Sequence, residues 1–191
     1  FFLFGSLLAL LAIPFWVHAF LGAAGPWQPV GGWLAWHRHE LVFGFAGAII
    51  VGFLLTAVQT WTGRPSISGK PLAGLLLVWL AARASWLLAA PLWLLIPLNL
   101  LFLLLAALMM GRLLWAVRQK NNYPTVAILL LLLLAEAQCL AGLALEDHDW
   151  QRRAVLAAVW LVAAMMTLIG GRVIPFFIQR GLGRPAAVKP V

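Results

Sequence analysis

The chain has 191 residues, of which 64% are hydrophobic and 9% are charged, and this composition excludes a water-soluble globule because soluble domains are about 25% charged. The formal net charge is +8, but the basic residues are spread singly over predicted loops, so we expect no nucleic-acid partner. The single cysteine, Cys139, excludes a disulfide framework, a cysteine-ligated iron–sulfur cluster and the attachment motif of a c-type haem.

Apolar runs bounded by glycine, proline and charged residues predict membrane-spanning helices, since about 20 apolar residues cross the bilayer core. We expect about six spans, at residues 1–22, 39–60, 71–90, 92–117, 124–145 and 153–178. Several runs are apolar on every side, which excludes the alternating pattern of a membrane β-barrel. The predicted fold is an all-α, polytopic helix bundle that forms a single domain within a lipid bilayer. Because the chain starts inside an apolar run without an initiator methionine, we expect it to be a fragment of a longer protein.

The distribution of lysine and arginine predicts the orientation in the membrane. One side of a six-span chain collects most of the basic residues: Arg64, Lys70, Arg112, Arg118, Lys120, Arg172, Arg180, Arg184 and Lys189. The other side holds fewer basic residues, with acidic ones beside them: Arg38, Arg152, Arg153, Glu40, Glu146, Asp147 and Asp149. By the positive-inside rule, the first side is cytoplasmic and both ends of the fragment face it.

This topology predicts the side of the membrane on which each polar residue of the spans lies. All four histidines come out on the non-cytoplasmic side: His18, His37, His39 and His148. Arg83 in the third span and Glu136 in the fifth lie within the membrane, nearer to the same side. A charged side chain in the membrane normally faces the bundle interior and has a partner. We therefore hypothesise that Arg83 and Glu136 form a direct pair.

The densest polar feature is the run from Trp36 to Glu40, Trp-His-Arg-His-Glu, where the second span begins. Imidazole and carboxylate groups bind transition metals, and imidazole is an axial haem ligand. On a regular helix His37 and His39 point about 200° apart, so both reach one metal only if this turn is not helical. The alternative is that both are interfacial polar residues. Further along, Gly44, Ala48 and Gly52 form a small-residue stripe that favours close helix packing, although a flat macrocycle could also approach it.

Several blocks of the sequence together resemble the NnrS family. They are the opening Phe-Phe-Leu, the Trp-His-Arg-His-Glu run leading into Phe-Gly-Phe, the segments 51–57 and 61–65, and Gly-Arg-Val-Ile-Pro-Phe-Phe at 171–177. The resemblance implies a polytopic bacterial inner-membrane protein that contains haem and copper. It also implies a role in the response to nitric oxide and nitrosative stress, often in denitrifying bacteria.

Carried over to this sequence, the resemblance implies that His37, His39 and Glu40 are the leading candidate haem or copper ligands. It also implies that Arg83 and Arg172 have functional roles. His18 and His148 are weaker candidates, which our topology places on the same side. Members of the family are about twice as long, and their second half carries a His-Thr-Gly-Arg block that this chain lacks. A complete site would then need a missing second half or a partner subunit.

The function expected from these features is tolerance of nitric oxide at the membrane, by binding or protection. Turnover of nitric oxide as an oxidoreductase stays open, although Glu136 as the single internal acid is thin support for a proton relay. The alternative is a transporter subunit for a metal or a small anion, with Arg83 and Glu136 lining the path. A third possibility is a purely structural membrane subunit in which the histidines bind nothing.

Overall fold

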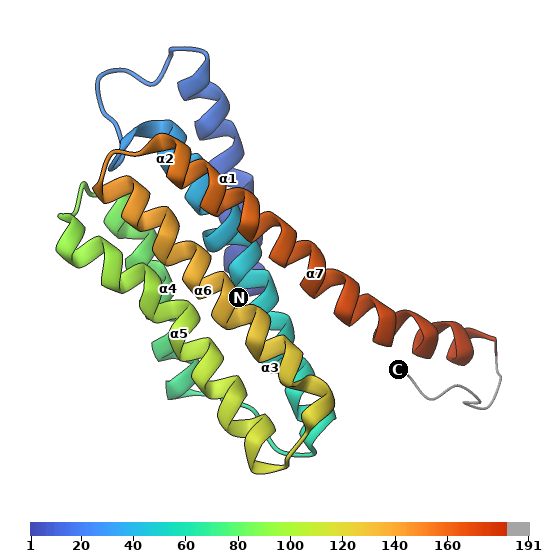
Figure 1. Cartoon of the computed structure of the whole chain (residues 1–191). Coiled ribbons are helices and arrows are strands. Elements are labelled where there is room, and N and C mark those ends of the chain that lie inside the picture. The colour runs from blue at the N-terminus through green and yellow to red at the C-terminus, as the bar shows by residue number, and fades with distance from the viewer. Residues whose placement is uncertain (183–191) are drawn as a thin grey trace.

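A computed structural model describes residues 1–182 of the chain, and these residues form helices and connecting turns without any strand. The elements are α1 (Phe2–Phe20), α2 (Gly32–His39), the π-helix η1 (Glu40–Ala46), α3 (Gly47–Thr62), α4 (Lys70–Leu87), α5 (Leu92–Ala116), the short 3₁₀-helix η2 (Lys120–Asn122), α6 (Tyr123–Ala144) and α7 (His148–Gly181). Figure 1 shows them assembled as a helical bundle, so the predicted all-α fold is confirmed. Arg184 and Lys189, which the topology argument used, lie outside the described residues.

Five helical runs in the described part of the chain are long and apolar enough to cross a membrane: Phe2–Phe20, Gly32–Thr62, Leu92–Ala116, Lys120–Ala144 and His148–Pro175. They correspond to five of the six predicted spans. The remaining predicted span, 71–90, corresponds to α4, an 18-residue helix that carries both Lys70 and Arg83. These two charges lower the mean hydropathy of α4. The helix is nevertheless part of the bundle, because it packs against α5 and η1.

The second span is the centre of the bundle. The helices α2, η1 and α3 follow one another without a break, and 56% of the most apolar window of this run is buried, against 11% for α1 and 17% for α7. The run begins at Gly32 rather than at residue 39, because Gly31 adopts a left-handed conformation (φ +68°) that glycine accepts without strain. It ends at Gly63, which caps α3 in the same conformation. The two histidines of the predicted site therefore lie inside a helix.

The helix α1 packs against the small-residue stripe of this central run. A Cβ atom added to Gly52 would lie 2.9 Å from the Cβ of Phe1, and one added to Gly44 would lie 3.2 Å from Cδ2 of Leu8. On α1 itself, a Cβ added to Gly5 would lie 3.6 Å from the Cβ of Ala48. Such close approaches are what small residues allow between membrane helices. The prediction that the stripe serves helix packing is confirmed.

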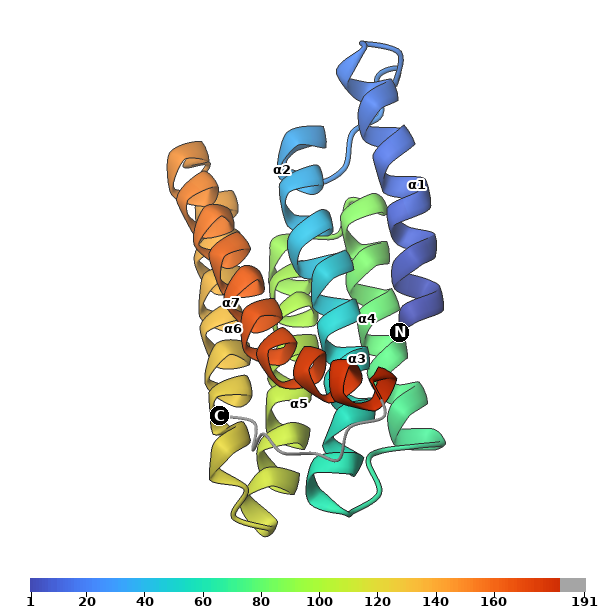
Figure 2. The same ribbon diagram turned by 90° about the vertical axis from the view of Figure 1, so that its right-hand side faces the viewer.

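The helices α4 to α7 pack as successive antiparallel neighbours, and α7 crosses the bundle obliquely so that its C-terminal part extends away from it (Figures 1 and 2). Asp147 caps the start of α7 by accepting a hydrogen bond from the backbone N–H of Trp150 at 2.8 Å. Further along α7, Arg172 donates hydrogen bonds to the side chain of Asn122 and to the backbone carbonyl of Asn121, at 2.5 Å in the second case. Arg172 thus ties α7 to the turn between α5 and α6.

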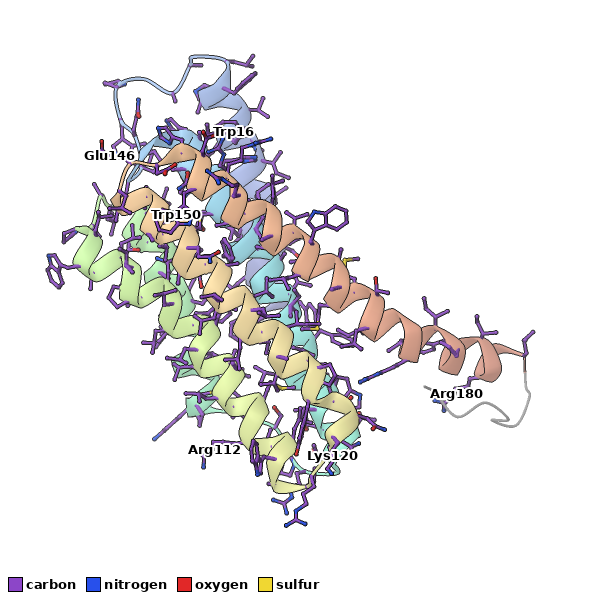
Figure 3. The ribbon with its side chains drawn as sticks, viewed as in Figure 1. Trp16, Arg112, Lys120, Glu146, Trp150 and Arg180 are labelled. Atoms are coloured by element: carbon purple, nitrogen blue, oxygen red, sulfur yellow. The ribbon has the colours of Figure 1, made fainter. Side chains whose placement is uncertain are left out.

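The two ends of the bundle differ in charge, as the sequence predicts for the two sides of a membrane protein. Figure 3 shows Trp16, Glu146 and Trp150 near one end and Arg112 and Lys120 near the other. The chain order places α2 and the turn between α6 and α7 at the first end, so the segments that carry the four histidines gather there. The histidine-bearing segments therefore lie at the opposite end of the bundle from Arg112 and Lys120.

Candidate functional site

A cluster of buried polar side chains lies where the central run changes from α-helix to π-helix. His39 is the last residue of α2 and Glu40 is the first of η1, and their exposed fractions are 0% and 1%. The π-helix is also held from outside, because the indole N–H of Trp79 on α4 donates a 3.0 Å hydrogen bond to the backbone carbonyl of Gly44. Short π-helical turns within α-helices are frequent at functional sites. We therefore take this turn as the centre of the candidate site.

His39 lies between two carboxylates. Its Nδ1 is 3.1 Å from Oε1 of Glu40, and its Nε2 is 3.2 Å from Oε1 of Glu136 on α6. A neutral imidazole carries a single N–H, so both contacts can be hydrogen bonds only when the group holds one further proton, either on the ring or on a carboxyl. His39 is thus the link between the central run and α6.

The second carboxylate oxygen of Glu40 pairs with Arg83 on α4. The distance between Oε2 of Glu40 and Nε of Arg83 is 2.9 Å. Nη2 of Arg83 donates a 2.5 Å hydrogen bond to Oδ1 of Asn99 on α5, and the indole N–H of Trp86 donates to the same oxygen at 3.3 Å. Asn99 in turn donates from Nδ2 to the backbone carbonyl of Leu95 at 2.8 Å. The hydrogen bonds and ion pairs therefore run without a break from α6 through the central run and α4 to α5.

This arrangement corrects the predicted direct pair between Arg83 and Glu136. Arg83 contacts Glu40, and Glu136 contacts His39, so the two residues are connected only through the side chains between them. The sequence argument placed Glu40 at the non-cytoplasmic end of the second span and did not consider it as the partner of Arg83. Because the helix begins at Gly32 rather than at residue 39, Glu40 lies about two helical turns further from the start of the helix than that argument assumed.

The net charge of the cluster is zero when the cluster holds the additional proton. Glu40 and Glu136 contribute two negative charges and Arg83 contributes one positive charge, so a protonated His39, or a protonated carboxyl, makes the sum zero. Burying an uncompensated charge is expensive. All four side chains are at least nine-tenths buried. With that proton the cluster is neutral, and its contacts join the four helical segments α2, η1, α4 and α6.

His37 points away from this cluster. Its ring stacks on Trp16 of α1, with the ring centroids 4.4 Å apart and the planes at 16°. The residue is half-buried, and its Nδ1 is buried without a hydrogen-bond partner in the described chain. His37 and His39 therefore face different helices. The proposal that both could bind one metal through a non-helical turn is wrong, because the turn is helical.

The remaining candidates do not join His37 or His39. His18 is exposed near the end of α1, and His148 is exposed at the start of α7. Arg172 binds the turn between α5 and α6, as described above. Within residues 1–182, no three histidine, cysteine, aspartate or glutamate side chains are placed so that they could hold a metal ion by themselves.

His37 and His39 differ in whether a ring nitrogen is available to bind a haem or copper group. Both ring nitrogens of His39 already contact carboxylates, and the residue has no exposed surface. Glu40 is likewise engaged at both oxygens. His37 has an unpartnered ring nitrogen and part of its surface is open, and imidazole is the ligand type that haem iron and copper share. His37 fits as a ligand to such a group, whereas His39 and Glu40 do not.

Three residues of the site escaped the sequence analysis. Asn99 is a polar residue in the middle of an apolar run, and this contrast is a signal that could have found it. Trp86 and Trp79 supply indole N–H donors to the site, and the sequence analysis gave neither of them a role. Nothing in the sequence distinguishes these two from the rest of its 11 tryptophans.

Comparison with known proteins gives one match. The family model described as NnrS protein matches residues 1–191 of the chain. No curated protein and no solved structure matches the chain significantly.

Proposed function

The chain belongs to the NnrS family, which makes it a multi-pass membrane protein of the nitric oxide response, and from this premise we propose that it binds a haem or copper group through His37. The observation that carries the proposal is the unpartnered, buried Nδ1 of His37, held in place by the stacked ring of Trp16. A haem or copper centre supplies the open coordination position that nitric oxide can occupy. His37 would hold that centre at the face of α2 that meets α1.

In this proposal His39 and Glu40 have a positioning role. They hold α2 against α6 and α4 through Glu136 and Arg83, and this fixes the direction in which the neighbouring His37 points. One ligand from this chain does not complete a metal site. We therefore propose that a second half of the protein or a partner subunit supplies the other ligands, and that the protein acts by binding nitric oxide or protecting the cell from it.

We further propose that the protein lies in the bacterial inner membrane, with the end that carries Glu146 facing away from the cytoplasm. The basic residues Arg112 and Lys120 at the opposite end support this orientation, because positive residues favour the cytoplasmic side. His37 would then bind its group near the non-cytoplasmic surface.

The test is a visible absorption spectrum with parallel metal analysis on the protein purified in detergent from haem-sufficient cells. We expect the H37A variant to lose most of the Soret absorbance or the bound copper at an unchanged yield of folded protein. The exposed histidines provide matched controls, and H18A and H148A are expected to retain the wild-type spectrum. Wild-type content of haem and copper in H37A would contradict the proposal, and so would the absence of both from wild-type protein that is folded together with the second half or partner subunit.

A further inference from the structure

Several buried polar atoms along the seam between α2, α6 and α7 have no protein partner. Gln151 on α7 is 1% exposed, and neither Nε2 nor Oε1 of its amide has a hydrogen-bond partner among the described residues. The same holds for Oε2 of Glu136 on α6 and for Nη1 of Arg38 on α2. Buried polar groups in folded proteins are satisfied by protein or by ordered water. Unsatisfied atoms contributed by all three helices therefore point to water in the seam.

A cavity opens at one end of this seam. It has a volume of about 250 Å³ and is lined by Gly31, Ala35, Gly142, Leu143, Glu146, His148 and Gln151. These residues come from the start of α2, the end of α6 and the start of α7, the three elements that form the seam. A cavity of this size with polar groups in its wall has room for several water molecules.

Gln151 lines the cavity, and the unpartnered atoms of Arg38 and Glu136 belong to residues that lie deeper. On α6, Gly142 lines the cavity, Cys139 follows about one turn deeper, and Glu136 about two turns deeper, roughly 9 Å along the axis at 1.5 Å per residue. On α2, Ala35 lines the cavity and Arg38 lies about one turn deeper. Cys139 lies within the electrostatic range of both Arg38 and Glu136, so these groups share one region.

We propose that a chain of water molecules fills this seam and connects the cavity beside His148 with the carboxylate of Glu136. Water entering the cavity would first meet the amide of Gln151, then Arg38, and finally the open oxygen of Glu136. The seam gives the buried cluster of His39, Glu40, Glu136 and Arg83 contact with the aqueous phase at one end of the bundle. This inference does not depend on haem or copper binding.

The single cysteine provides the measurement. Cys139 is fully buried, and its S–H stretching band is well separated from other protein vibrations. Exchange of this thiol hydrogen for deuterium requires contact with water. We expect the Cys139 band of the membrane-reconstituted protein to disappear in D₂O faster, on the order of tenfold or more, than the band of a matched dry thiol. That control is the double variant C139A/L132C, because Leu132 is also buried and lies on the same helix.

Two variants of Gln151 test the route. Q151L fills the seam with an apolar side chain of similar size and is expected to slow exchange at Cys139 toward that of the dry control. Q151A leaves the seam open and is expected to exchange at least as fast as the wild type. Loss of folding would speed exchange, so it cannot imitate the expected effect of Q151L. Exchange at Cys139 as slow as at L132C, or fast exchange that Q151L does not slow, would overturn the proposal.

Discussion

Replacing Arg83 with leucine is expected to destabilise the fold by about 3–5 kcal/mol, the range found when one partner of a buried ion pair is removed. Glu40 would keep its buried charge without the guanidinium 2.9 Å away, and Asn99 would lose the donor to its side-chain oxygen. We expect R83L to lower the midpoint of thermal unfolding in detergent strongly. The measurement is the loss of monodisperse protein on size-exclusion chromatography after heating.

The control for R83L is R112L, because Arg112 is an exposed arginine on α5 with no ion pair to another described residue. It should change the unfolding midpoint little. The exchanged variant R83E/E136R separates the observed network from a direct pair. Because Arg83 and Glu136 contact different residues, this exchange should be no more stable than either single variant. A restored midpoint in R83E/E136R would contradict the network described above.

Replacing Gly142 with alanine is expected to force α6 and α7 apart at a close backbone contact. The added Cβ would lie 2.8 Å from the backbone nitrogen of Gln151 and 3.1 Å from the backbone carbonyl oxygen of Asp147. Backbone atoms cannot move aside as a side-chain end can, so the expected loss of stability is at the upper end of the 1–3 kcal/mol, approximately, that overpacking costs. The measurement is again the unfolding midpoint in detergent.

The matched control for G142A is G74A. Gly74 is also inside a helix, but a Cβ added there meets no atom within 4 Å. Alanine favours helix over glycine by up to about 1 kcal/mol, so G74A should be neutral or slightly more stable than the wild type. If G142A is as stable as G74A, the close contact between α6 and α7 is not present in the membrane protein.

The fold was predictable because membrane helices leave a strong signal in composition. Apolar runs of about 20 residues gave the positions of α1, α5 and α6 nearly to the residue. The start of the second span was misplaced because its first two turns, from Gly32 to His39, contain polar and charged residues that a search for apolar residues treats as a loop. Burial of such residues depends on partners from other helices, which a local pattern does not contain.

The sequence predicted which charged residues lie inside the bundle, but it did not predict which residues contact each other. Intramembrane charge correctly indicated that Arg83 and Glu136 lie inside the bundle, where both are buried. The partner of each was missed, since Glu136 contacts His39, 97 positions away, and Arg83 contacts Glu40 on a different helix. The opposite directions of His37 and His39 follow from helical geometry, once the structure shows that the turn is helical.

The π-helix η1 affects the direction in which the side chains of α2 point relative to α3. A turn of π-helix contains one residue more than the corresponding turn of α-helix, and each α-helical residue rotates the chain by about 100°. If the same residues from Glu40 to Ala46 formed an α-helix instead, the additional residue would rotate α2 by about that angle relative to α3. The imidazole of His39 would then no longer face α6, although every residue of the buried cluster would still be present. The π-helical conformation of this segment therefore sets the direction in which the histidines point, independently of their identity.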